Sequence, residues 1–162
     1  FICFSAEEAW LSRNPDGESV HLRAFPEIPK SWRDDVLAEK WTRVRSLRRV
    51  VTGALEVERA EKRIGSSLEG RIEVYVDEDN MAAMEGVDLA EIAISSSAEL
   101  CQGSAPQGAF VMDDVSGVGV ICKKAEGEKC SRCWKVVEDL GHIANHPEAC
   151  PRCADAADAF QA

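Results

Sequence analysis

The hydrophobic residues at the start of the chain recur at helical spacing. The apolar positions of FICFSAEEAWLSR predict a helix over residues 1–13, and residues 14–17 (NPDG) follow it as a turn. Residues 20–25 are expected to be extended. Pro26 and Pro29 exclude a helix from the segment between them.

A longer apolar stripe predicts a long helix from Ser31 to about Ile64. Ser31 is the expected N-cap because a serine hydroxyl accepts a hydrogen bond from the first helical amides, and Gly65 is the expected stop. The apolar residues recur at steps of three and four, which places them on one buried face. They are Leu37, Trp41, Val44, Leu47, Val51 and Leu55.

After Gly65 the period changes to that of a strand. Apolar and polar residues alternate over 68–76, which predicts a strand with one buried face. We then expect, in order, a short acidic helix over 79–91, a strand over 91–100, a loop over 102–109, a strand over 118–123 and a closing helical turn over 154–160.

Four cysteines near the C-terminus have the spacing of a zinc site. Cys130 and Cys133 form one C-x2-C pair, Cys150 and Cys153 form another, and 16 residues separate the pairs. A redox site would need one reactive pair rather than two spaced pairs. Four thiolates close the coordination shell, so we expect one structural zinc ion with no open position for catalysis.

These patterns together predict an α+β fold with a helical segment that contains one long helix, a small sheet with a short helix, and a C-terminal four-cysteine zinc finger. We expect three domains, over residues 1–66, 67–125 and 126–162.

The side chains around the cysteines allow two interpretations. Trp134 directly follows the first pair and could pack across the site, which is the commoner role, or stack on an unpaired base. Arg132, Lys135 and Arg152 could balance the formal charge of about −2 that four thiolates leave on a zinc dication. They could equally bind phosphate.

One run of the predicted long helix is basic. It contains Lys40, Arg43, Arg45, Arg48 and Arg49. No acidic residue lies between Lys40 and Leu55, whereas solvated helix faces usually mix both signs. We therefore predict unpaired guanidinium groups that bind RNA phosphates, with a solvated face as the alternative.

The charge is distributed unevenly, although the net charge of −10 argues against a polyanionic partner. Residues 1–66 carry 12 Lys and Arg against 11 Asp and Glu, residues 67–125 carry 3 against 11, and residues 126–162 carry 4 against 7. The acidity is concentrated in the middle of the chain, which leaves the basic helix as a local patch for nucleic acid.

The sequence contains no motif for catalysis and no membrane-spanning run. It has no glycine-rich phosphate loop and no nucleophile–base set, and no apolar run approaches the roughly 20 residues that span a bilayer. Paired C-x2-C motifs with three scattered cysteines favour a reducing cytoplasm. Phe1 lies inside an apolar run, so we expect a fragment of a longer polypeptide. We also expect it to be monomeric.

Several segments, in order, resemble one family. Residues 4–10 and 19–22 resemble the late part of the anticodon-binding helical domain of class I tRNA synthetases, and residues 61–69 resemble the same domain of the isoleucine enzyme. Residues 127–134, closed by 150–153, resemble the C-terminal zinc finger of bacterial isoleucyl-tRNA synthetases.

The resemblance implies a fragment that binds isoleucine tRNA near the anticodon, with the catalytic domain of the parent enzyme in the same chain. That enzyme uses ATP to join isoleucine to its tRNA. Its two ATP-binding signatures, H-x-G-H and K-M-S-K-S, are absent here, so we expect no catalysis from this fragment alone. The same zinc finger type resembles one in certain DNA glycosylases. A DNA-repair fragment and a zinc-stabilised protein-interaction module are therefore the alternatives.

Overall fold

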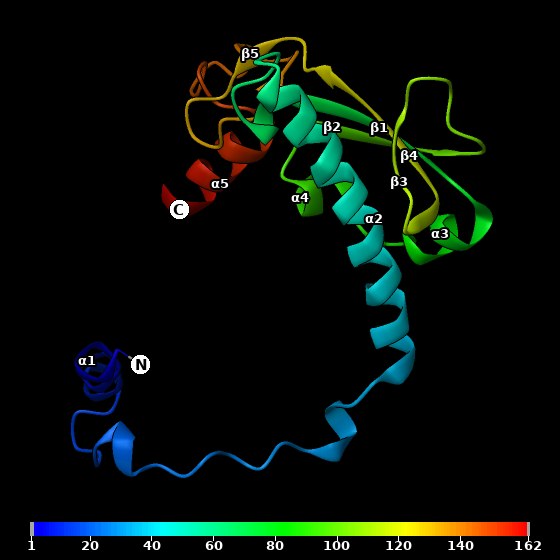
Figure 1. Ribbon diagram of the computed structural model, residues 1–162. Coiled ribbons are helices and arrows are strands. Elements are labelled where there is room, and N and C mark those ends of the chain that lie inside the picture. The colour runs from blue at the N-terminus through cyan, green and yellow to red at the C-terminus, as the bar shows by residue number, and fades with distance from the viewer. Residues whose placement is uncertain (1, 162) are drawn as a thin grey trace. The chain divides into compact units, whose positions relative to one another are not determined.

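The computed structural model describes residues 2–161, with the side chain of Gln161 excepted, in two compact units that divide between Asp35 and Val36 (Figure 1). Phe1, which the sequence analysis places in the first helix, lies outside the described residues. Each unit is described by itself.

The first unit contains one α-helix and two single turns of 3-10 helix. Helix α1 covers Cys3–Arg13, as predicted, and the 3-10 turns cover Val20–Leu22 and Lys30–Trp32. The expectation of extended chain over 20–25 is therefore wrong at its start. The cause is local: the Glu7 carboxylate accepts hydrogen bonds from the Ser19 hydroxyl and the Val20 amide, both at 2.9 Å, and so tightens this turn.

The long helix α2 covers Asp35–Ala60 and is shorter at both ends than predicted. Ser31 is not its N-cap, because Ser31 lies within the 3-10 turn that precedes the helix. The helix ends before Gly65, since Lys62 adopts a left-handed φ of 60°. The Arg63 amide then donates to the Glu58 carbonyl over 3.0 Å, a pairing that satisfies a carbonyl at the end of the helix.

The second unit contains a four-stranded mixed sheet. Strands β1 (Gly70–Val76), β2 (Ser97–Gln102), β3 (Phe110–Met112) and β4 (Val115–Lys124) lie in the order β2-β1-β4-β3. Strand β1 pairs in parallel with β2 and antiparallel with β4. The loop predicted over 102–109 connects β2 to β3, a short strand that the sequence analysis missed.

Two short helices connect β1 to β2, where one acidic helix and an early strand were predicted. Helix α3 covers Glu78–Ala83 and α4 covers Leu89–Ala93. The strand expected from residue 91 therefore begins only at Ser97. The reason is a cap: the Asp88 carboxylate accepts a hydrogen bond from the Glu91 amide over 3.0 Å and starts α4.

Helix α2 packs on one face of the sheet and forms the core with it (Figure 1). Alternate residues of β1 and β4 point into this core, which matches the alternation predicted over 68–76. The helix contributes Val44, Leu47, Val50, Val51, Ala54 and Leu55. Leu37 and Trp41, which the predicted stripe included, remain 49% and 38% exposed.

The C-terminal part forms a small module with its own buried cluster. It consists of the hairpin of β5 (Glu128–Lys129) and β6 (Val136–Val137), followed after a loop by α5 (Pro151–Gln161). Helix α5 is longer than the closing turn predicted over 154–160. The α+β class with a C-terminal four-cysteine module is confirmed. Within residues 2–161, no helix has the length and apolar character to cross a membrane.

Candidate zinc site and the basic surface around it

The first C-x2-C pair is held in a tight turn by the backbone. The Cys130 amide donates to the Lys135 carbonyl over 2.9 Å, and the Trp134 amide donates back to the Cys130 carbonyl over 3.0 Å. Gly127, which leads into the hairpin, has a φ of 111°, and any side chain there would collide with the Val137 carbonyl. These contacts turn both sulfurs of the first pair toward the second pair.

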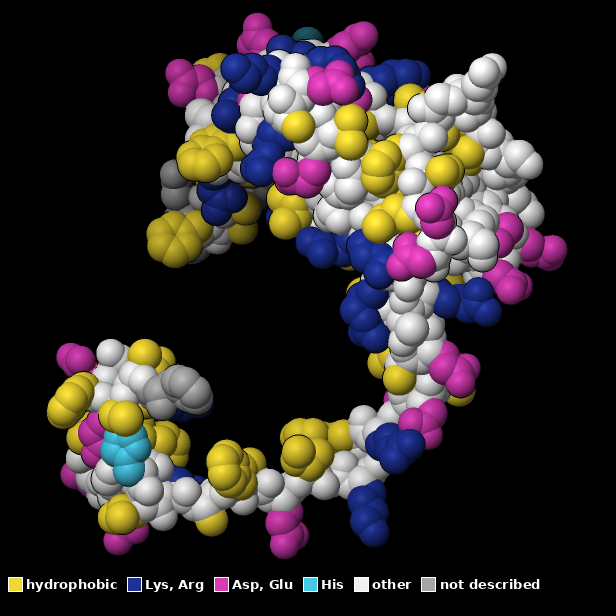
Figure 2. Space-filling model, viewed as in Figure 1, with side chains coloured by type: hydrophobic (Ala, Val, Ile, Leu, Met, Phe, Trp, Pro, Cys, Tyr) yellow, Lys and Arg dark blue, Asp and Glu magenta, His cyan; other side chains and the backbone are white. Residues whose placement is uncertain are grey.

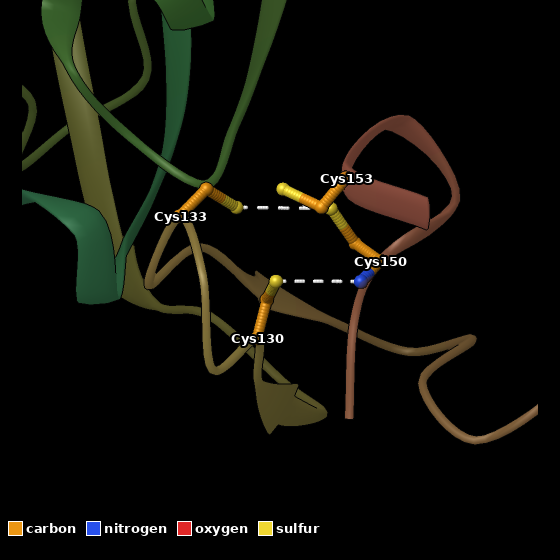
Figure 3. Close-up of side chains that lie close together, drawn as sticks. All are labelled: Cys130, Cys133, Cys150 and Cys153. Atoms are coloured by element: carbon orange, nitrogen blue, oxygen red, sulfur yellow. Dashed lines mark hydrogen bonds between the residues drawn. The ribbon is translucent and has the colours of Figure 1, made fainter. Parts of the chain in front are cut away.

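The second pair lies at the start of α5. The Cys153 amide donates to the Cys150 carbonyl over 2.9 Å, so this turn continues directly into the helix. The Cys150 amide also donates to the Cys130 sulfur over 3.3 Å, which joins the two pairs (Figure 3). The two ends of the module therefore meet at the sulfurs.

The four sulfurs fit a single tetrahedral zinc ion. They all lie within 4.8 Å of one another, and the Cys133 and Cys150 sulfurs are 3.7 Å apart (Figure 3). Thiolates at about 2.3 Å from a zinc ion occupy tetrahedral corners about 3.8 Å apart. The donor set and its spacing support one structural zinc held by Cys130, Cys133, Cys150 and Cys153.

The local environment shifts the pKa values of the Cys130 and Cys133 thiols in opposite directions. Burial raises the pKa of Cys130, but backbone hydrogen bonds, led by those from Cys133 and Cys150, outweigh burial and lower it to about 6. Burial raises the pKa of the Cys133 thiol. A dication between the sulfurs favours the thiolate form at all four positions, so zinc supplies the charge that holds the cluster together.

Trp134 does not pack across the zinc site, which was the commoner of its two expected roles. Its side chain is 60% exposed and its φ is 67°, a left-handed conformation that is rare outside glycine. The Lys129 ammonium lies 5.5 Å from the centre of the indole ring. Ile94, at the end of α4, is also left-handed and 55% exposed, and it lines the same hollow of about 540 Å³.

Lys135 and Arg152 have a protein partner that the sequence analysis did not predict. One oxygen of the Glu91 carboxylate accepts hydrogen bonds from Lys135 Nζ over 2.9 Å and from Arg152 Nη1 over 2.5 Å. The Lys135 hydrogen bond is the main cause that lowers the pKa of Glu91. Arg132 is exposed and has no carboxylate partner among residues 2–161.

Two basic residues of α2 form ion pairs with acidic residues from other elements. Arg43 pairs with Asp79 at 3.6 Å and Arg49 with Asp114 at 2.5 Å, so the expectation of an unpaired guanidinium group is wrong for Arg49. Both acids come from elements outside the helix, so the spacing of charges along α2 alone does not predict these pairs. In Figure 2, Lys and Arg side chains lie along the exposed length of α2.

Three further basic residues of α2 contact carbonyl or hydroxyl oxygens. Lys40 Nζ donates to the Glu85 carbonyl over 2.6 Å and Arg48 Nε to the Ile92 carbonyl over 2.6 Å. Arg45 Nη2 donates over 3.1 Å to Thr42 of its own helix, which leaves Arg45 without an acidic partner in the described part of the chain.

Helix α4 accepts hydrogen bonds from basic residues of both α2 and the zinc module. Arg48 reaches it from α2, and Lys135 and Arg152 reach it from the zinc module. Sequence reasoning missed these contacts because it ended a helix and began a strand at Glu91. The capping residue Asp88 was the signal that could have identified a helix start there.

Comparisons with known proteins match these features. The family described as "Zinc finger found in FPG and IleRS" matches residues 127–156. The isoleucine–tRNA ligase of Brucella abortus (strain 9-941) is 50% identical over 160 residues, which cover 98% of this chain and 16% of that protein.

Two further relatives carry the same printed name, isoleucine–tRNA ligase. The protein from Mesorhizobium japonicum is 50% identical over 153 residues (92% of this chain, 15% of that protein). The protein from Agrobacterium fabrum is 50% identical over 154 residues (94% and 16%). The chain thus spans about one sixth of the length of these relatives, and its expected resemblance to the C-terminal region of bacterial isoleucine–tRNA ligases is confirmed.

Proposed function

We propose that this chain is the tRNA-binding C-terminal part of an isoleucine–tRNA ligase, and that its zinc module and α2 contact the anticodon arm of isoleucine tRNA. Residues 1–66 would complete the anticodon-binding domain, 67–125 would form the small α/β domain, and 126–162 would form the zinc finger. The catalytic domain of such an enzyme, in the same polypeptide, would join isoleucine to the tRNA with ATP. The part described here would bind as a cytoplasmic monomer without catalysis.

The exposed indole of Trp134 is the observation that carries this proposal. A nonpolar ring of this size is normally buried, yet it lies open beside Ile94 and Leu68 in an apolar hollow. Left-handed backbone at two non-glycine residues costs roughly 1–3 kcal/mol each, and such strain gathers at binding sites. An unstacked base of an RNA loop would stack on this ring, and Lys129 beside it would attract the phosphate backbone.

Cations without acidic partners support an RNA partner over a protein partner. Arg45 and Arg132 have no acidic partner among the described residues, and each presents a planar guanidinium that suits phosphate. The other members of the proposed RNA-binding set are Lys40, Arg43, Arg48, Arg49, Lys135 and Arg152, which already contact protein groups. We therefore assign phosphate contact first to Arg45 and Arg132, and to the others to the extent that RNA displaces those partners.

Filter binding with the zinc-loaded chain and total tRNA tests the proposal. We expect retention that weakens with added salt, because phosphate contacts release counterions. ATP–pyrophosphate exchange should be at background. Retention of duplex DNA in preference to tRNA would favour the DNA-repair alternative. Binding to neither nucleic acid would favour a protein-interaction module, and either result would reject the proposal.

A further inference from the structure

The zinc module (residues 126–162) is attached to the sheet domain (β1–β4 with α2, α3 and α4) through one carboxylate. The turns of both cysteine pairs contact this carboxylate. Lys135 follows the first cysteine pair, and Arg152 lies within the second. Both donate to the same oxygen of Glu91 on α4, over 2.9 and 2.5 Å. Glu91 therefore joins both zinc turns to one helix of the sheet domain.

Ser96 supports the same attachment from the other end of the α4–β2 connection. Its hydroxyl accepts a hydrogen bond from the Val136 amide, in strand β6, over 2.6 Å. The same hydroxyl donates to the Leu68 carbonyl, just before β1. Val136, which follows the Trp134–Lys135 turn, is thereby connected to Leu68, which lines the hollow beside the indole.

Helix α4 is itself attached to α2. Arg48 Nε donates to the Ile92 carbonyl over 2.6 Å, directly next to Glu91. A continuous set of contacts thus runs from α2 through α4 to both cysteine pairs. This set connects the turn that carries Trp134 to α2, the helix that carries Arg45.

We propose that Glu91 is a positioning residue for RNA binding, which holds the zinc module on α4 so that Trp134 and the α2 guanidinium groups form one surface. This inference rests on the proposed tRNA-binding function. Glu91 touches no RNA on this account, and Lys135 and Arg152 act mainly as its partners. A folded RNA contacts the indole and α2 at once, so it depends on their spacing, whereas a short single strand on the indole does not.

Direct contact of Lys135 and Arg152 with RNA phosphates would predict the opposite change in tRNA affinity for a Glu91 variant. If Lys135 and Arg152 were direct phosphate contacts, the Glu91 carboxylate would compete with RNA for them. Removing its charge would then strengthen binding and steepen the salt dependence, because two cations would become available to phosphate.

The test compares Glu91→Gln with Glu56→Gln in the full 162-residue, zinc-loaded chain. Glu56 forms an exposed ion pair with Arg59 within α2 at 2.9 Å, so its variant loses one charge and one ion pair without touching the zinc module. Each variant is titrated with tRNA and with a single-stranded RNA trinucleotide at several salt concentrations. Bound zinc is measured for both variants.

We expect Glu91→Gln to weaken tRNA binding about threefold to tenfold relative to Glu56→Gln. Trinucleotide affinity, the salt dependence and one bound zinc per chain should be unchanged. Tighter or equal tRNA binding by Glu91→Gln would overturn the inference, and so would a parallel loss of trinucleotide binding or of zinc, which would indicate a merely structural role. Absence of tRNA binding by the unsubstituted chain would instead reject the proposed function.

Discussion

Arg48 of α2 donates its Nε hydrogen bond to the carbonyl of Ile92, at the end of α4, over 2.6 Å. Charge pattern alone assigned Arg48 to RNA, but its geometry places it on a helix-end carbonyl that would otherwise lack a partner. Arg45, three residues earlier, has only Thr42 of its own helix as a partner among residues 2–161. The two arginines therefore differ in what their loss should change.

Arg45→Ala should reduce tRNA binding without reducing stability. Loss of one phosphate contact weakens binding to all RNA sequences about equally and lowers the salt slope by about one. Fluorescence anisotropy titrations at several salt concentrations measure the tRNA affinity and the salt slope. Arg59→Ala is the matched control, because Arg59 lies on the same helix, pairs with Glu56 and is outside the proposed RNA-binding set, so its loss should leave the salt slope unchanged. An unchanged salt slope for Arg45→Ala would assign Arg45 to a solvated face.

Removal of zinc should unfold the C-terminal module and leave the sheet domain folded. The two parts have separate buried clusters, and the smaller one is built around the cysteines. Metal binding supplies the folding free energy of such small modules, so Cys133→Ser or a strong chelator should abolish dispersion of the NMR signals from 126–162. tRNA affinity should fall by about tenfold or more. Full affinity from metal-free protein would contradict a role for the module in binding.

Trp134→Ala should weaken RNA binding with little change in the melting temperature. Stacking of a base on an aromatic ring contributes about 1–3 kcal/mol, or roughly 5- to 150-fold in affinity. The indole is 60% exposed, so its removal leaves only a small cavity. Trp134→Phe keeps a smaller ring and should retain part of the affinity. Calorimetry measures the change in melting temperature, and trinucleotide titration measures the change in RNA affinity. A large loss of stability with unchanged binding would place Trp134 in the core instead.

Glu58 should contribute to acid unfolding. A hydrogen bond from Arg63, over 2.5 Å, holds the pKa of the Glu58 carboxyl below its ordinary value of 4.5. As the pH falls below about 4.5, the unfolded state takes up a proton more readily than the folded state. The stabilisation is therefore present in full above that pH and decreases as the pH falls through the folded pKa.

Glu58→Gln tests this pair by urea denaturation at several pH values between 3 and 7. The variant should be less stable at neutral pH and should lose less stability between pH 5 and pH 3 than the unsubstituted chain. Glu61→Gln, which alters a more exposed acid near the same arginine, is the control. Identical pH profiles for Glu58→Gln and the unsubstituted chain would show that the pair does not contribute.

The sequence predicted the zinc ligands and the main elements because their signals are local. The spacing of two C-x2-C pairs and the alternation over residues 68–76 both depend on a few neighbouring positions. The α2 stripe was likewise correct where the sheet covers it, from Val44 to Leu55. Capping decided the boundaries instead: Lys62 ended α2 before Gly65, and Asp88 started α4 where a strand was expected.

The partners of the charged residues could not be predicted, because they come from distant parts of the chain. Asp114 lies 65 residues from Arg49, and Glu91 lies 61 residues from Arg152. A basic run without nearby acids therefore does not establish free cations once the chain has folded. The exposure of Trp134 could not be predicted either, because it follows from the left-handed turn that closes the first cysteine pair.

Competition binding tests the central claim most directly. A labelled anticodon stem-loop of isoleucine tRNA is bound to the zinc-loaded 162-residue chain, and unlabelled isoleucine tRNA, another tRNA and duplex DNA compete for it. The account predicts that isoleucine tRNA displaces the stem-loop at the lowest concentration and that chelation of zinc weakens the complex by about tenfold or more. Equal displacement by duplex DNA, or a complex that survives zinc removal unchanged, would contradict it.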